Sequence, residues 1–193
     1  EQTENPARAV SFAPHITELM FALGLGDRVV GVTRFCDSPT EVSALPHVGD
    51  SFSPEIETLV ALDPDLVLCH GSMESLGAQI RRLGLDTLGL PSETVSDLHA
   101  SIEVLGRIFR VEERARALSE AIAADLDRAR EAAARVTPVP CVLILERRPG
   151  RLQDMTAVGS DNVIDELLTL AGGRNVLASL PSRYPKVTLE QLV

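Results

Sequence analysis

The hydrophobic pattern of the chain is clearest in residues 111–136, a stretch without glycine or proline. Apolar side chains recur there every three or four positions and form a single helical stripe: Val111, Ala115, Leu118, Ile122, Leu126, Ala129, Ala133 and Val136. Abundant Ala, Glu and Arg favour helix. Pro138 and Pro140 end it, because proline lacks an N–H and disfavours helical backbone in the residue before it. We therefore predict one helix of about 39 Å, at about 1.5 Å per residue.

Short β-type runs and helical patterns alternate before this helix. The runs that predict strands are 7–13, 28–33, 66–69 and 86–90. Helical spacing or capping signals predict helices at 16–23, 40–44, 53–62, 74–83 and 95–109. The helix at 53–62 has a strong start signal, with Ser53 as N-cap and Pro54 in the first helical position. This alternation indicates a mostly parallel sheet.

A second set of elements follows the long helix. Residues 141–145 begin a new sheet, 157–159 form a short strand, and 162–170 form a helix capped by Asn162. The order of elements in 15–39 recurs in 162–185: a helix, a glycine stop, a short apolar strand and a loop ending in proline. Residues 54–61 are echoed by 187–193. The long helix could be an outer helix of a single α/β domain or a strut between two lobes, and the repeat favours two lobes.

The predicted fold class is α/β, with two Rossmann-like lobes joined by one long backbone helix. We expect an N-terminal lobe at 1–110, the connecting helix at 111–136 and a C-terminal lobe at 137–193. The first copy of the repeat continues into a core strand at 66–69, whereas the second has no counterpart before Val193. The second lobe is therefore predicted to be truncated.

Charge and cysteine content narrow the function. With 18 basic and 28 acidic residues the net charge is −10, which disfavours binding to a nucleic-acid backbone. No apolar run reaches the roughly 18 residues of a membrane span, and the polar first residues, which lack a signal-peptide pattern, are typical of a processed protein. Three cysteines without a CxxC pair disfavour structural zinc, and they fit either one disulfide plus a thiol or three thiols.

Several segments together resemble one known family. They are residues 8–33, 36–39, 45–50 and 56–68 in the first half, and 164–176 and 184–193 in the second. Their sequence and order resemble the helical-backbone class of solute-binding proteins of ABC importers, the receptors for cobalamin, haem and ferric siderophores. The resemblance implies two α/β lobes on one long helix, with a metal chelate held in the cleft between them. A preformed cleft suits a bulky, rigid ligand, because ordering costs stay low.

The same resemblance implies a transport role. The protein would capture a metal-chelate nutrient and deliver it to the transmembrane permease subunits. It would act as a monomer without a cofactor or metal of its own, in the periplasm or as an extracellular membrane-tethered lipoprotein, after removal of its export signal. It would not be an enzyme, and it would bind no nucleic acid. The same sequence features are expected in a receptor that acts in sensing instead of uptake.

Candidate ligand-binding residues come from the loops at the carboxyl ends of the predicted strands, where parallel sheets bind ligands. They are Pro14, His15, Arg34, Phe35, Cys36, Ser51, Phe52, His70, Arg148 and Tyr184. In the cobalamin-binding relatives, the positions resembling Phe35, Ser51, His70 and Tyr184 are aromatic and pack against the corrin. Only Phe35 and Tyr184 are aromatic here, with Phe52 next to Ser51. The ligand therefore stays open among cobalamin, haem and a ferric siderophore.

The chemistry of these residues leaves alternatives. Guanidinium groups of Arg34, Arg147, Arg148 and Arg151 can clamp anionic oxygens, or they can be solvated loop charges. His15 and His70 can coordinate a metal centre, or fill a loop and cap a helix. His47 and His99 are expected at the surface. Cys36 and Cys69 form a disulfide, supply an axial thiolate, or are two small buried side chains, of which we favour the last.

Glu57 and Glu190 occupy matching places in the two repeats. In the family, acids at these positions dock onto arginines of the permease, and two carboxylates at a fixed separation would align the receptor on a two-fold-related partner. Helix dipoles alone also favour acids at such positions. The recurrence in both repeats favours docking.

The competing class is an enzyme. The sequence contains no GxSxG elbow, no glycine-rich phosphate loop, no HExxH, and no GxGxxG after a strand. The remaining enzymatic alternative is a thiol- or metal-dependent α/β enzyme that uses Cys36, Cys69 and His70.

Overall fold

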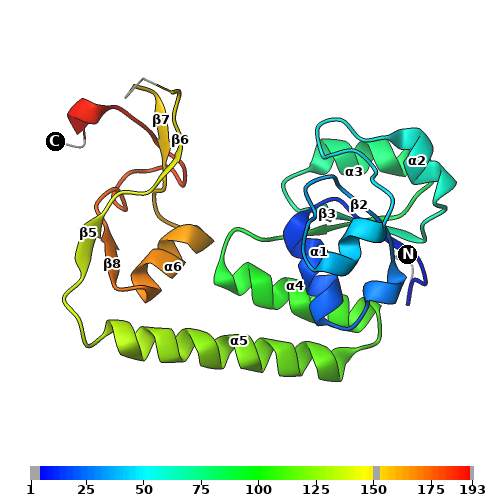
Figure 1. The fold of residues 1–193 in the computed structure, drawn as a ribbon, viewed down its shortest axis with the longest axis horizontal. Coiled ribbons are helices and arrows are strands. Elements are labelled where there is room, and N and C mark those ends of the chain that lie inside the picture. Colours follow the sequence, from blue (N-terminus) through cyan, green and yellow to red (C-terminus); the bar gives the residue numbers. More distant parts are fainter. Residues whose placement is uncertain (1–4, 150–152, 192–193) are drawn as a thin grey trace. The chain divides into compact units, whose positions relative to one another are not determined.

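The computed structural model describes residues 5–149 and 153–191, which form two compact units (Figure 1). The first unit comprises Glu1–Ser92 and Ser96–Glu120, and the second comprises Glu93–Val95 and Ala121–Val193. The boundary falls inside the long helix α5 (Glu112–Ala133), so both units include part of that helix. The fold is α/β with one long backbone helix shared by two lobes, as the sequence predicts.

A four-stranded parallel sheet organises the first unit. The strands are β1 (Ala9–Ser11), β2 (Val29–Val32), β3 (Leu66–His70) and β4 (Thr87–Leu90), in the order β2-β1-β3-β4. Their residues are almost all apolar and buried, as expected when helices cover both faces of a parallel sheet. The helices are α1 (Pro14–Ala22), α2 (Ile56–Ala61), α3 (Glu74–Arg81) and α4 (Val95–Ile108), with 3₁₀ turns at Gly26–Arg28 and Thr40–Ala44. Figure 1 shows these four helices, coloured by their position along the chain.

The core of the first unit forms where strands and helices bury their apolar residues together. Phe12, which follows β1, is 1% exposed and packs in one cluster with Leu59 of α2 and Ile80 of α3. The carboxyl end of the central strand therefore rests on a rigid base. The loops that follow these strands are therefore held in position by a packed core, and a binding site requires such a scaffold.

Helix α5 is continuous over 22 residues. The predicted apolar stripe is its less exposed side: Ala115 is buried, and Leu118, Ile122, Leu126, Ala129 and Ala133 are half-buried. At its N-terminal end it packs closely on α4, since a Cβ added at Gly106 would lie 2.5 Å from the Ala115 Cβ. The helix ends three residues before the predicted Val136, and Val136 itself is 57% exposed.

The second unit contains two small sheets. Strands β5 (Val139–Cys141) and β8 (Gly173–Asn175) pair in parallel, and β6 (Ile144–Glu146), β7 (Met155–Ala157) and β9 (Lys186–Val187) form an antiparallel sheet. They are joined by α6 (Val163–Leu170) and a 3₁₀ turn at Leu189–Gln191. The buried cluster is small, namely Met155, Ala157, Leu177 and Val187.

Three local predictions were wrong. Helix α2 begins at Ile56, not after Ser53, because the backbone N–H of Glu55 donates to the Val48 carbonyl at 2.9 Å and keeps the chain extended through Pro54. The predicted strand at 141–145 is divided between β5 and β6, which belong to different sheets. Similarly, β7 ends at Ala157, earlier than the predicted 157–159.

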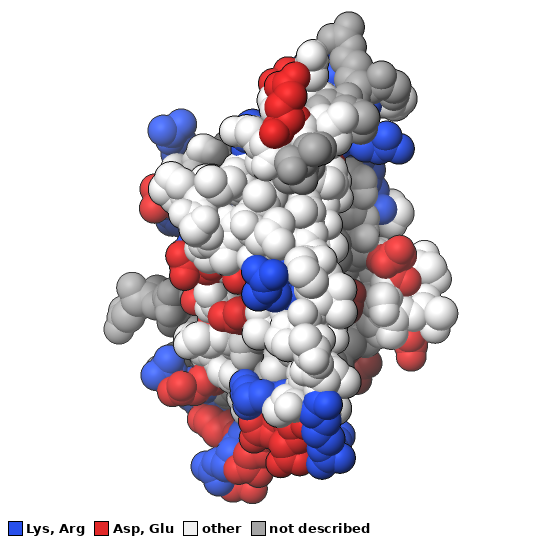
Figure 2. Space-filling model, turned by 90° about the vertical axis from the view of Figure 1, so that its left-hand side faces the viewer, with Lys and Arg blue, Asp and Glu red and all other residues white. Residues whose placement is uncertain are grey.

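Much apolar surface of the second unit is exposed. Figure 2, viewed from the side of this unit, shows a broad surface with few charged residues. The large apolar residues of the second unit that are exposed are Val136, Val139, Ile144, Leu145, Leu167, Val176 and Leu189. No helix in the described part of the chain has the length and apolar character required to cross a membrane.

Candidate functional site

The carboxyl edge of the parallel sheet gathers the first-unit candidates. Pro14 and His15 follow β1, Arg34 and the next residues follow β2, and His70 is the last residue of β3. The loop at 50–53 joins them, because the Ser51 hydroxyl donates to the Phe12 carbonyl at 3.1 Å. We call this group of residues the strand-end cluster: Pro14, His15, Arg34, Phe35, Asp50, Ser51, Phe52 and His70.

The two histidines of the cluster touch. Their ring centroids are 5.7 Å apart in an edge-to-face arrangement. The Nε2 atom of His15 is buried without a hydrogen-bond partner. The pKa of His15 is lowered from its usual 6.5, first by burial and then by the nearby His70. Both effects favour the neutral form of His15.

The hydrogen bonds of His70 define its tautomer. The backbone N–H of Ser72 donates to His70 Nδ1 at 3.1 Å, and the Ser72 hydroxyl lies 2.7 Å from the same atom. Because a backbone N–H can only donate, Nδ1 acts as an acceptor and neutral His70 carries its proton on Nε2. This tautomer disfavours Nε2 as a metal ligand, since a ligating nitrogen must offer its lone pair.

The lowered pKa of His15 predicts a pH dependence of stability. Unfolded His15 takes up a proton below pH 6.5 while folded His15 stays neutral until a lower pH, so the unfolded state binds more protons in that window. Stability is therefore expected to fall as pH drops from about 7 to about 5. Urea unfolding at both values, in wild type and His15→Gln, measures the effect. An equal pH dependence in both proteins would contradict it.

Asp50 organises the other half of the cluster. Its Oδ1 accepts the backbone N–H groups of Phe52 and Ser53, both at 2.8 Å, and its Oδ2 forms an ion pair with Arg34. These backbone hydrogen bonds, from Ser53 and then Phe52, together with the Arg34 charge, lower the pKa of Asp50, although burial opposes them. The guanidinium of Arg34 lies 5.0 Å from the centroid of the Phe35 ring.

Asp50 is absent from the sequence-predicted site, although the turn sequence that begins at Gly49 indicated a role for it. Gly49 has a φ of +78°, and a Cβ there would lie 2.3 Å from the Ser53 carbonyl oxygen, so only glycine fits the tight turn. An Asp after such a glycine, followed by Ser-Phe-Ser, is typical of a side chain that bonds its own backbone two or three residues on. The turn presents Phe52, which is 92% exposed.

The three cysteines are free, so Cys36 and Cys69 form no disulfide. Cys36 is 5% exposed, and its sulfur is 3.2 Å from the hydroxyls of both Thr17 and Thr33. Burial raises the pKa of the Cys69 thiol to about 11, against the opposing charge of Arg81. A buried thiol with a raised pKa, such as that of Cys69, is a poor nucleophile, which disfavours the enzymatic alternative. In the described residues no group of three or more His, Cys, Asp and Glu side chains is placed to hold a metal ion.

The second unit contains the remaining ligand-binding candidates. The Tyr184 hydroxyl donates to Glu93 Oε2 at 3.3 Å, and burial, followed by Glu93, raises the pKa of Tyr184. Tyr184 is 38% exposed. Arg148 and its neighbour Arg147 are exposed in the loop after β6, and Arg151 lies outside the described residues.

The two predicted docking acids are both exposed. Glu57 lies in the first turn of α2, and Glu190 lies in the 3₁₀ turn at Leu189–Gln191. The Thr188 hydroxyl donates to Glu190 Oε2 at 3.4 Å, a long contact that leaves the carboxylate at the surface.

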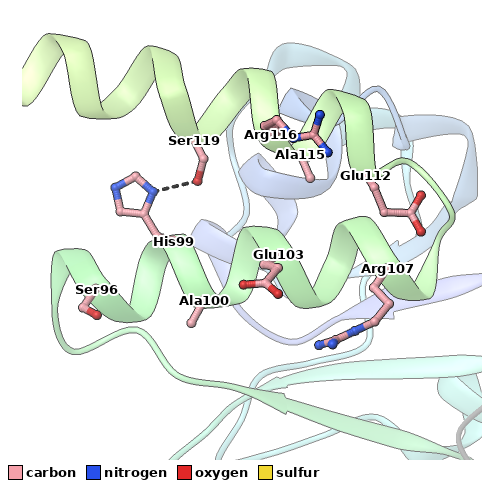
Figure 3. A pocket seen from close by; sticks show the side chains of 9 residues that line it. All are labelled: Ser96, His99, Ala100, Glu103, Arg107, Glu112, Ala115, Arg116 and Ser119. Atoms are coloured by element: carbon pink, nitrogen blue, oxygen red, sulfur yellow. Dashed lines mark hydrogen bonds between the residues drawn. The ribbon is translucent and has the colours of Figure 1, made fainter.

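A groove of about 700 Å³ lies between α4 and α5 in the first unit (Figure 3). His99, predicted at the surface, is half-buried there and hydrogen-bonds Ser119 through Nδ1 at 2.7 Å, whereas His47 is exposed. The groove also contains two acids and two arginines: Glu103, Arg107, Glu112 and Arg116. Each Glu precedes an Arg by four residues on its helix, so the charges balance. None of the sequence-predicted ligand residues lines the groove.

Two α/β units that share one long helix have the architecture of the helical-backbone class of solute-binding proteins. Residues 10–193 match the periplasmic binding protein family, and the chain belongs to this family. It is 32% identical over 181 residues to the uncharacterized ABC transporter substrate-binding lipoprotein YvrC of Bacillus subtilis, covering 91% of this chain and 57% of that protein.

Solved structures show the same fold. The periplasmic vitamin B12 binding protein BtuF of Vibrio cholerae has a TM-score of 0.81 and 26% identity, over 97% of this chain and 72% of that one. A periplasmic haem-binding protein from Pseudomonas aeruginosa has a TM-score of 0.84 and 25% identity, over 97% and 68%. The chain thus spans just over half of the Bacillus relative and about 70% of the solved structures.

Proposed function

We propose that this protein is an extracytoplasmic solute-binding protein of an ABC importer that captures a metal-chelate nutrient and delivers it to a membrane permease. Membership of the periplasmic binding protein family supports the class. Relatives named for vitamin B12 and haem binding support a metal macrocycle as ligand.

The observation that carries the ligand proposal is the strand-end cluster. Phe35 and Phe52 are 58% and 92% exposed in loops at the carboxyl edge of a parallel sheet, and Phe35 lies beside Arg34, which pairs with Asp50. Exposed aromatic rings are costly unless a ligand or partner covers them, and such rings stack on conjugated ligands. His15 and His70, which contact each other edge to face, supply polar groups at the same edge of the sheet. Tyr184 and Arg148 are the proposed contacts from the second unit.

Permease docking is assigned to Glu57 and Glu190, which are exposed carboxylates in short helical segments. A carboxylate attracts an arginine of the partner over several ångströms and sets its orientation, and this contributes more to association rate and register than to affinity. The location that goes with this role is the periplasm or a lipid-anchored position outside the cytoplasmic membrane. A relative named as a lipoprotein supports that location.

Isothermal titration of the full-length protein tests the ligand. Cyanocobalamin, haemin and a ferric tris-catecholate are titrated in separate experiments, with ligand-free buffer as the control. We expect at least one to bind with a Kd in the range from about 1 nM to about 1 μM. Phe35→Ala and Phe52→Ala are each expected to weaken that binding by about tenfold, because stacking is lost. Failure of all three chelates to bind would refute the proposal.

A further inference from the structure

Arg34 is held in place before any ligand arrives. Its guanidinium pairs with Asp50, and its backbone N–H donates to the Gly49 carbonyl at 3.1 Å. The Arg34 side chain is 60% exposed, whereas that of Asp50 is 5% exposed. The cation therefore faces solvent on one side and a buried carboxylate on the other.

This carboxylate cannot turn away from Arg34. Its other oxygen accepts two backbone N–H groups, those of Phe52 and Ser53, and the Asp50 N–H donates to the Ser53 carbonyl at 3.1 Å. Rotation of the Asp50 side chain would take away the acceptor that the backbone N–H groups of Phe52 and Ser53 now share. An anionic ligand group must therefore compete for Arg34 with a fixed, nearly buried negative charge.

Paired with Asp50, Arg34 can still stack on a flat ligand. The charges of Arg34 and Asp50 sum to zero, and the guanidinium carbon of Arg34 lies over the Phe35 ring, 5.0 Å from its centroid. Guanidinium planes and aromatic rings both stack on flat conjugated systems. Phe52 is presented by the turn that the same carboxylate holds. One carboxylate thus holds Arg34, which lies over Phe35, and also holds the backbone of Phe52.

We propose that Asp50 is a positioning residue that withholds Arg34 from anionic groups and fixes Arg34, Phe35 and Phe52 as a stacking surface, so that the first unit selects chelates with a flat macrocyclic face over anionic chelates. This inference rests on the proposed function and deepens it by naming the ligand class. Arg34 then acts as a neutralised flat surface, and not as the anion clamp that its residue type alone predicts.

Asp50→Asn separates the two roles of the carboxylate. The amide oxygen still accepts the N–H groups of Phe52 and Ser53, so the turn is retained, but the charge that holds Arg34 is lost. Binding of a ferric tris-catecholate, a trianion, is expected to strengthen by about tenfold, and cyanocobalamin binding is expected to weaken by about fivefold. In the Arg34→Met background the same change is expected to have less than about a twofold effect on either chelate, which a purely structural role of Asp50 would not produce.

A salt titration of the wild type needs no variant. If Arg34 is neutralised, the Kd for the trianionic ferric tris-catecholate is expected to rise by less than about twofold between about 0.05 and 0.5 M NaCl, whereas a free Arg34 cation would give a much steeper dependence. Equal weakening of both chelates by Asp50→Asn, the same effect of Asp50→Asn with and without Arg34, or tighter wild-type binding of the tris-catecholate than of cyanocobalamin would overturn the role of Asp50 alone. Failure of cyanocobalamin, haemin and the tris-catecholate to bind at all would overturn the proposed function, and the role of Asp50 with it.

Discussion

Reversal of charge at both Glu57 and Glu190 is expected to abolish uptake of the bound chelate by cells and to leave its affinity for the isolated protein within about twofold. Both side chains are exposed, and neither belongs to the strand-end cluster. Two lysines in place of two carboxylates turn attraction to a basic partner into repulsion at both contacts. Like charges placed together in an interface cost several kcal/mol, which is enough to reduce docking by more than about a hundredfold.

The measurement is uptake of labelled chelate in cells that lack the natural receptor, alongside calorimetry on the purified variants. A matched control reverses two other exposed acids, Glu74 in α3 and Glu131 in α5, and so changes the net charge equally. Uptake by the control should stay near the wild-type rate. Normal transport by the Glu57→Lys, Glu190→Lys protein, or equal loss in the control, would remove the docking role from these two acids.

Asn162→Ala is expected to destabilise the second unit by about 2–4 kcal/mol. Asn162 is fully buried, and its Oδ1 caps α6 by accepting the N–H groups of Ile164 and Asp165, both at 3.1 Å. Its amide donates to the carbonyls of Gly159, Ser160 and Arg183 at 3.1–3.3 Å. Alanine leaves donors and acceptors unpaired on both sides, in a unit whose apolar cluster is small.

The chain offers a local probe for this experiment, because it contains one tyrosine and no tryptophan. Fluorescence of Tyr184 therefore reports on the second unit, and we expect its urea transition to move to lower concentration in Asn162→Ala. Asn162→Ser keeps a capping oxygen but loses the amide donors, so an intermediate shift is expected. A Tyr184 transition within about 0.5 kcal/mol of wild type would show that these hydrogen bonds contribute little.

Local sequence signals predicted what depends on neighbours along the chain. The stripe of Leu118, Ile122 and Leu126 predicted the long helix, and Asn162 before an apolar run predicted the start of α6. Local signals failed where a tertiary contact competed. Pro54 reads as the first residue of a helix, but a hydrogen bond from Glu55 to Val48 keeps that segment extended. The long-range hydrogen bond is favoured over the helical conformation because it satisfies the backbone N–H of Glu55, which would otherwise be unpaired.

Part of the candidate site could be predicted from the sequence, and part required the tertiary structure. The loops that contain His15, Arg34 and His70 could be found from the sequence, because parallel strands place their carboxyl ends along a single edge. The sequence could not assign Asp50 to Arg34, nor show the edge-to-face contact of His15 with His70. These pairs lie far apart along the chain, and only the order of strands in the sheet decides which loops become neighbours.

By itself the sequence determined the α/β alternation, the long helix and the resemblance to metal-chelate receptors, because helix periodicity, capping and β-branched runs act over a few residues. Tertiary structure decided the charge state of the site: whether Arg34 meets a ligand as a free cation or as half of a neutral pair depends on a carboxylate 16 positions away, brought to it by the turn at Gly49. Residue types predict which charges and hydrogen-bonding groups are present, and the fold determines which of them are already paired with each other.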